Sequence, residues 1–179
     1  MIEVTSDMLA GLVVSRTVGI AAIPAPTGSE AVRAGLVAGW WREDGWTDVD
    51  VDATGNVWAL ARPGQGGAVV LAAHLDTVFD ADGAHVVREG DGRLLGPGVG
   101  DDSVAVAALS AVGSLLATAA GRPVLLLATV GEEGLGNLRG IVAALDGFGA
   151  AVEAVLAVEG HYLARQRTDP TPTAETRPR

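Results

Sequence analysis

Three nearly uninterrupted apolar stretches dominate the hydrophobic pattern of the chain, at residues 69–73, 124–130 and 154–158. An apolar run of this length is typical of a strand that is buried on both faces of a sheet. Each run is followed closely by charged residues or histidine. The pattern therefore predicts three central strands with polar side chains at their ends.

Apolar residues at helical spacing fill much of the rest of the chain. Ser6 and Ser29 are capping residues in front of two such patterns, and Glu30 falls in the first turn of the second. Strands that alternate with helices imply parallel pairing and right-handed crossovers. The predicted fold is an α/β three-layer sandwich with a mostly parallel central sheet. We expect helices in residues 6–22, 29–44, 104–120 and 138–147, and a β-hairpin in residues 49–61.

Length and composition favour one compact domain. Of the 179 residues, 49% are hydrophobic, which is ample for a single core. After Ala164 the sequence consists mainly of charged residues, threonines and prolines, with almost nothing to bury. We therefore expect a domain in residues 1–164 and a disordered polar tail in residues 165–179.

Charge and cysteine content exclude several classes of function. The formal net charge is -10, and the clustered Lys and Arg that nucleic acid or an anionic membrane surface requires are missing. Because the chain has no cysteine, any metal must be held by histidine and carboxylates. The N-terminus lacks the pattern of a secretory signal, and no apolar stretch is long enough to span a bilayer. We expect a cytoplasmic protein that binds neither nucleic acid nor membrane.

Candidate chemistry lies at the carboxyl ends of the predicted strands. His74 and Asp76 follow the first run, Glu132 and Glu133 follow the second, and Glu159 follows the third. Because parallel strands share one carboxyl edge, where ligands bind, we expect these side chains to converge. A histidine at a strand end can reach a ligand outside the sheet, and Asp76 lies on the same side and can orient the imidazole.

Two other kinds of site fit the sequence poorly. A Gly-x-Gly-x-Gly segment at residues 96–100 precedes a helix, as in phosphate loops. Asp101 and Asp102, however, would put negative charge where a phosphate needs the positive end of the helix dipole. The Gly-x-Ser-x-Gly elbow of a serine hydrolase is missing. His85 lies in a polar, glycine-rich segment, and we expect a surface histidine there.

A divalent-metal site accounts for most of the candidate residues. Histidine and carboxylates suit zinc or a similar ion, and one carboxylate can bridge two ions. Two ions about 3.5 to 4 Å apart can activate a water and polarise a carbonyl oxygen. Adjacent residues at a strand end point in different directions, so one of Glu132 and Glu133 can bind metal while the other acts as general base.

Four motifs in series resemble those of one enzyme family. In order and spacing they resemble the dinuclear zinc peptidase family that contains aminoacylase, acetylornithine deacetylase, succinyl-diaminopimelate desuccinylase, glutamate carboxypeptidase and tripeptide aminopeptidase. The resemblance covers almost everything from residue 6 to residue 161. The motifs are His74-Leu75-Asp76-Thr77-Val78, Gly96-Pro97-Gly98-Val99-Gly100-Asp101-Asp102, Gly131-Glu132-Glu133-Gly134 and Val158-Glu159-Gly160.

The resemblance implies a ligand set for two metal ions. His74 and Glu159 would hold one ion, Glu133 would hold the other, and Asp101 would bridge the two. The ions would be zinc, with cobalt or manganese as alternatives. The same resemblance implies that Asp76 orients His74.

The resemblance also implies the reaction, which is hydrolysis of an amide bond in a short peptide or an N-acyl amino acid. Glu132 would take a proton from the attacking water and later give it to the leaving amine. Together with Asp76 it forms the predicted catalytic pair.

The sequence departs from the family pattern after residue 164. Family members continue into a lid and dimerisation domain, and they supply a last histidine ligand from near the C-terminus; these 179 residues contain neither. His161 follows the wrong strand to replace that ligand. We therefore expect a truncated catalytic domain with impaired hydrolysis. The alternative is a non-catalytic remnant with a weak or single-metal site.

Overall fold

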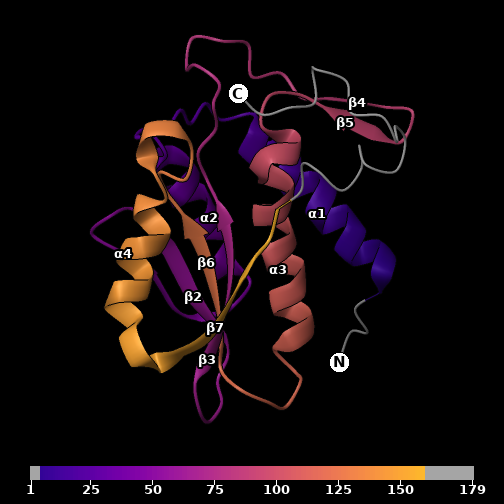
Figure 1. The fold of residues 1–179 in the computed structure, drawn as a ribbon. Coiled ribbons are helices and arrows are strands. Elements are labelled where there is room, and N and C mark those ends of the chain that lie inside the picture. The colour runs from indigo at the N-terminus through magenta and orange to yellow at the C-terminus, as the bar shows by residue number, and fades with distance from the viewer. Residues whose placement is uncertain (1–4, 160–179) are drawn as a thin grey trace, which may run out of the picture.

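A computed structural model describes residues 5–159 of the chain. Its main sheet has five strands in the order β1-β2-β6-β3-β7, and a separate pair of short strands forms a second sheet (Figure 1). The predicted tail at residues 165–179 and His161 lie outside the described residues. The elements are α1 (Ser6–Ala21), α2 (Ala31–Glu43), β1 (Thr47–Val51), β2 (Val57–Arg62), β3 (Ala68–His74), β4 (Arg88–Gly90), β5 (Arg93–Leu95), η1 (Val99–Ser103), α3 (Val104–Leu116), β6 (Val124–Thr129), η2 (Gly134–Gly136), α4 (Arg139–Phe148), η3 (Gly149–Ala151) and β7 (Val152–Ala157).

The three predicted apolar strands form the parallel part of the main sheet. Strand β3 pairs in parallel with β6 on one side and with β7 on the other. The predicted hairpin extends the sheet as antiparallel β1 and β2, so the complete sheet is mixed. His74, the last residue of β3, is opposite Thr129, the last residue of β6. The carboxyl ends of β3 and β6 therefore stop at the same level.

Helices cover both faces of the sheet, which confirms the predicted three-layer α/β fold (Figure 1). The larger core joins α1, α2 and α3 to one face, and Trp41 and Leu126 are fully buried in it. The smaller core joins α4 to the other face around Val70 and Leu127. Apolar side chains on both faces of β3 and β6 explain why their sequences lack alternation.

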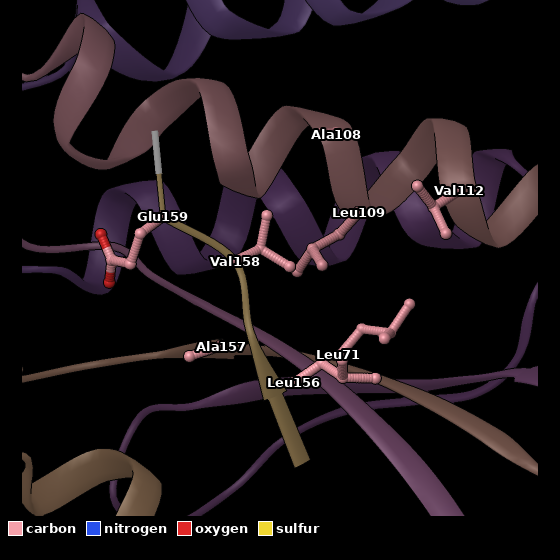
Figure 2. A pocket seen from close by; sticks show the side chains of 8 residues that line it. All are labelled: Leu71, Ala108, Leu109, Val112, Leu156, Ala157, Val158 and Glu159. Carbon is pink, nitrogen blue, oxygen red and sulfur yellow. The ribbon is translucent and has the colours of Figure 1, made fainter. Parts of the chain in front are cut away.

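Strand β7 differs from the expectation of a fully buried strand. It lies at the edge of the sheet, where it pairs with β3 on one side. Its residues Val155 and Leu156 are 39% and 53% exposed. A pocket of about 340 Å³ opens between β7, β3 and α3, and Figure 2 shows Leu71, Leu109 and Leu156 among its apolar lining. Apolar sequence predicted the strand correctly, but the strand order leaves it with a single neighbour.

The segment after His74 contains a small hairpin where the sequence analysis found only a polar, glycine-rich segment. Strands β4 and β5 are antiparallel, and Gly90 pairs with Arg93. The two residues between them, Asp91 and Gly92, have positive φ angles of 52° and 69°. An Asp-Gly pair with positive φ at both positions is the preferred chemistry for a two-residue hairpin turn.

Helix α3 contributes a long apolar segment to the core. The stretch Val99–Leu116 is the one helical segment among residues 5–159 that is long and apolar enough to cross a membrane. Half of that stretch is buried inside the fold. Packing against β2, β3 and β6 therefore accounts for its apolar character.

Candidate metal centre

His74 ends β3 with its ring held in one orientation. The side chain is 3% exposed, and its Nδ1 lies 3.0 Å from the backbone carbonyl oxygen of Asp76. A carbonyl oxygen only accepts hydrogen bonds, so Nδ1 carries the proton and donates it. Nε2 points the other way, 3.0 Å from Oδ1 of Asp101. This arrangement leaves Nε2 as the nitrogen that can bind a metal ion.

Asp76 connects the loop after β3 to the loop after β6. Its carboxylate is fully buried and accepts hydrogen bonds from the backbone N–H groups of Glu132 and Glu133, both at 3.0 Å. The hydroxyl of Thr27 donates to the same carboxylate at 2.8 Å. The closest carboxylate oxygen lies 3.5 Å from Nδ1 of His74, so the shorter contact to the ring is the backbone carbonyl.

The hydrogen bonds to Asp76 also determine its charge. Burial alone would raise the pKa of this carboxyl group. The donors from His74, Glu132 and Glu133 outweigh burial and hold the pKa of Asp76 far below its usual range. Asp76 is therefore a permanent anion in the folded protein.

Asp101 and Asp102 follow the glycine-rich segment and approach His74 from the start of α3. Asp101 is partly exposed and faces the imidazole, whereas Asp102 is fully buried. One oxygen of Asp102 accepts the backbone N–H of His74 at 3.0 Å. Its other oxygen, Oδ1, is buried and has no hydrogen-bond partner in the described structure. Burial, together with the nearby carboxylate of Glu159, raises the pKa of Asp102 to about 8, against the opposing effect of His74.

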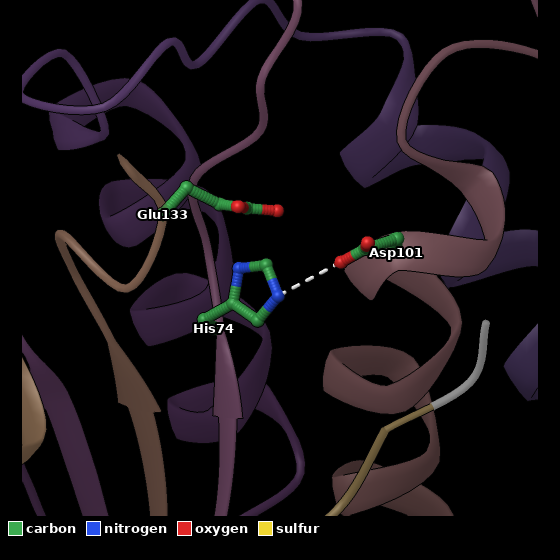
Figure 3. A group of neighbouring side chains, drawn as sticks. All are labelled: His74, Asp101 and Glu133. Atoms are coloured by element: carbon green, nitrogen blue, oxygen red, sulfur yellow. Dashed lines mark hydrogen bonds and ion pairs between the residues drawn. The ribbon is translucent and has the colours of Figure 1, made fainter. Parts of the chain in front are cut away.

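Three of the predicted ligands meet directly. One potential ligand atom each from His74, Asp101 and Glu133 lie within 4.8 Å of one another. Figure 3 shows the His74 ring between the two carboxylates, which come from separate elements of the fold. Their convergence follows from the shared carboxyl edge of β3 and β6, with Asp101 supplied from the segment before α3.

A second group shares His74 with the first. It consists of His74, Asp102 and Glu159, whose ligand atoms also lie within 4.8 Å of one another. Glu159 is exposed and follows β7 at the edge of the sheet. The structure thus brings together all four predicted metal ligands, in two groups, and adds Asp102, for which the sequence analysis assigned no role. The Asp-Asp doublet was the available signal, but the sequence does not show which of the two side chains faces the histidine.

Glu132 and Glu133 sit at the end of β6 and are both partly exposed. Their backbone N–H groups are fixed by Asp76, as described above, while their side chains remain at the surface of the site. Partial burial and the neighbouring carboxylates of Asp101 and Glu132 raise the pKa of Glu133. Burial is the larger of these causes, and repulsion from the neighbouring carboxylates adds to it.

The donor set fits a divalent cation. Imidazole nitrogen and carboxylate oxygen are ligands that suit zinc and similar ions. Several carboxylates gather around one histidine. Burial raises the pKa of Glu133 and Asp102 most, and the neighbouring carboxylates raise both further; a bound cation would oppose both effects by stabilising the anions. The orphaned Oδ1 of Asp102 also offers an acceptor that only a donor or a cation could satisfy.

Residues 70–173 of the sequence match the model of "Peptidase family M20/M25/M40". The chain belongs to this family. The match spans the metal-ligand candidates from His74 to Glu159 and confirms the family resemblance. The M20/M25/M40 enzymes are metal-dependent peptidases, which agrees with the donor set described above. A search of curated proteins finds no significant match.

Solved structures of peptidases share the fold. The aminopeptidase APDkam598 from the archaeon Desulfurococcus kamchatkensis superposes with a TM-score of 0.69 at 16% identity, covering 83% of this chain and 63% of that chain. The aminopeptidase PepT from Bacillus cereus gives a TM-score of 0.66 at 20% identity, with 84% of this chain and 43% of that chain covered. Aminoacylhistidine dipeptidase from Vibrio alginolyticus gives 0.53 at 24% identity, with 87% and 33% covered. The M20/M25/M40 chain described here therefore spans less than two thirds of the length of these structures.

Proposed function

We propose that this chain is a zinc-dependent metallopeptidase unit that hydrolyses the amide bond of a short peptide or an N-acyl amino acid. The observation that carries the proposal is the convergence of His74, Asp101 and Glu133 within 4.8 Å, in a chain of the M20/M25/M40 peptidase family. Peptidases among the similar structures favour peptides over N-acyl amino acids. The cytoplasmic location expected from the sequence forms part of the same proposal.

The proposed ligand set holds two ions. His74 and Glu159 would hold one ion, Glu133 would hold the other, and Asp101 would contribute to both. The proximity of Asp102 to Glu159 and His74 supports the first position. Bound ions would polarise the substrate carbonyl and acidify the attacking water.

Glu132 acts as the general base in this proposal. Its backbone N–H is bound by the buried carboxylate of Asp76, as is that of the neighbouring Glu133, so the loop that carries both glutamates is held at the ligand group. It removes a proton from the attacking water and returns that proton to the nitrogen of the leaving amine. Asp76 contributes by holding the loop that carries both glutamates.

A second candidate is a non-catalytic domain whose metal site is weak or holds a single ion. The exposed position of Glu159 at the edge strand favours it, because a ligand on an exposed strand end is poorly preorganised. Metal analysis after purification with zinc separates the candidates. Two tightly held ions per chain support the dinuclear site, one ion supports the second candidate, and none refutes both.

The Glu132→Ala variant tests the proposed base. We expect hydrolysis of a di- or tripeptide to fall by a factor of roughly 10² to 10⁴, with zinc content unchanged. Retained hydrolysis would remove Glu132 from the mechanism. Loss of zinc along with activity would instead make Glu132 a ligand.

A further inference from the structure

The buried carboxylate of Glu30 lies where α2 begins but does not cap that helix. Glu30 occupies the N-cap position and makes no side-chain capping bond, although the sequence had suggested Ser29 as the cap. The side chain is 4% exposed. Its Oε1 accepts the backbone N–H of Gly28 at 2.8 Å and the backbone N–H of Gly131 at 3.0 Å. The carboxylate therefore joins two loops that are about a hundred residues apart in sequence.

Gly131 is the residue directly before Glu132 and Glu133. Its φ angle is +63°, and a Cβ at this position would collide with the side chain of Arg139. The guanidinium of Arg139 lies 3.4 Å from the same Glu30 oxygen. Glu30 thus fixes the start of the loop whose next two residues are the proposed base and a proposed metal ligand.

Asp76 connects the same two loops at neighbouring residues. It accepts the hydroxyl of Thr27 and the backbone N–H groups of Glu132 and Glu133. Residues 27–30 are therefore attached to residues 131–133 at two buried carboxylates. Asp76 also approaches His74, whereas the contacts of Glu30 are to the two loops and Arg139.

We propose that Glu30 is a positioning residue that sets the loop of Glu132 and Glu133 against the His74 side of the metal centre. The roles of Glu132 and Glu133 rest on the proposed function. Removing the Glu30 carboxylate would leave the N–H of Gly131 buried without its acceptor, and such groups move to find a new partner. Displacement of this loop would shift the base and one ligand together, while His74 and Asp101, which lie on other segments, stay in place.

The test compares Glu30→Ala with Arg16→Ala as a control. Arg16 lies on α1 and pairs with Asp44, the residue at the opposite end of α2 from Glu30, roughly 20 Å away along that helix. Arg16 is also buried and charged, and it makes two hydrogen bonds of 2.7 Å to Asp44. Both variants should lower the unfolding temperature. Only Glu30→Ala should accelerate hydrogen exchange of the amides at residues 131–133, by at least about tenfold.

Zinc affinity and peptidase kinetics show how the same variants affect function. For Glu30→Ala we expect zinc affinity to fall about 10- to 100-fold and kcat to fall by a similar factor with little change in KM. Glu30→Gln keeps an oxygen that can accept from Gly131, so it should restore most of the slow exchange. If Glu30→Ala does not fold, Glu30→Asp replaces it, because the shorter side chain withdraws the oxygen while keeping the charge.

Equal changes in exchange at residues 131–133 for the Glu30 and Arg16 variants would overturn the proposal, as would an unchanged exchange rate in Glu30→Ala. Absence of zinc binding and hydrolysis in the wild-type protein would refute the proposed function instead. In that case the exchange measurement still decides whether Glu30 holds the loop, because it needs neither metal nor substrate.

Discussion

The two sides of the metal centre differ in how deeply the strands that carry them are buried in the sheet. On one side, β3 and β6 are interior strands of the sheet. A buried carboxylate, that of Asp76, connects the loops that follow them. On the other side, Glu159 follows β7, an edge strand whose Val155 and Leu156 are 39% and 53% exposed. The candidate ligands are close together on both sides, and on the first side buried carboxylates hold the backbone that carries them.

This difference follows from the sheet order rather than from the sequence of the strands. Strands β3, β6 and β7 are all apolar runs followed by polar residues. A strand in the middle of the sheet is covered on both faces and both edges, so its end can be fixed by groups from its neighbours. A strand at the edge lacks half of these neighbours, and its end depends on fewer contacts.

Removing Asp76 should have the largest effect on the metal centre, because it changes both folding stability and zinc binding. The Asp76→Ala variant leaves the N–H groups of Glu132 and Glu133 without their acceptor, and it frees the hydroxyl of Thr27. We expect a loss of about 3 kcal/mol in the free energy of unfolding, together with loss of tight zinc binding. Urea unfolding and metal analysis measure both. Unchanged zinc binding would mean that the loop after β6 is held by other groups.

The two proposed ligands on opposite sides of the centre should differ in importance. Glu133→Ala is expected to weaken zinc binding by at least about 100-fold, because it removes a ligand from a preorganised loop. Glu159→Ala should weaken it only about tenfold, because water can take the place of an exposed ligand. Calorimetric titration with zinc measures both affinities.

Glu153→Ala is the matched control for these titrations. Glu153 lies on β7, the strand that Glu159 follows, and its side chain is 53% exposed. Its removal changes the net charge equally and should leave zinc affinity unchanged. An equal loss for Glu133→Ala and Glu159→Ala would contradict the contrast between the two sides.

Zinc binding should release protons, because His74 is protonated in the metal-free protein. Burial opposes this charge, but the bonds to Asp101 and Asp76 outweigh it and raise the pKa of His74 to about 11. The stability that protonated His74 contributes is fully present below its ordinary pKa of 6.5 and is lost as the pH rises through about 11.

Metal competes for the same nitrogen, so zinc affinity should rise with pH, by about tenfold per unit for each proton released. Calorimetry in two buffers of different ionisation enthalpy counts the protons. A binding enthalpy that is independent of the buffer would show that His74 is neutral before zinc binds.

Local patterns in the sequence were sufficient for the fold class and most of the elements. Apolar runs located β3 and β6, and helical spacing located α2 and α4, because these patterns depend on neighbouring residues alone. The Asp91-Gly92 turn of the small hairpin was overlooked although its signal was present. The edge position of β7 carries no local signal, since it depends on which strands come to lie beside it.

The site was predictable to the level of residue types at strand ends. His74 and Glu133 were expected to converge at the strand ends, and the family resemblance added Asp101. The structure brings one ligand atom from each of the three within 4.8 Å of one another. The connections that support them were not predictable, because Glu30 and Gly131 are distant in sequence and meet only in the folded chain. Asp102 was overlooked because a sequence does not show which residue of a doublet is buried.

Among these variants, truncation of an apolar side chain on β7 should have the smallest effect on the free energy of unfolding, and a truncation on β6 provides the comparison. Leu126 on β6 is fully buried, and Leu126→Ala should lower the free energy of unfolding by about 2 to 5 kcal/mol. Leu156 on β7 is 53% exposed, so Leu156→Ala should cost about 1 kcal/mol or less. Urea unfolding of the two variants under the same conditions provides the measurement. A cost for Leu156 as large as that for Leu126 would mean that β7 is covered in solution, and Glu159 would then be held as firmly as Glu133.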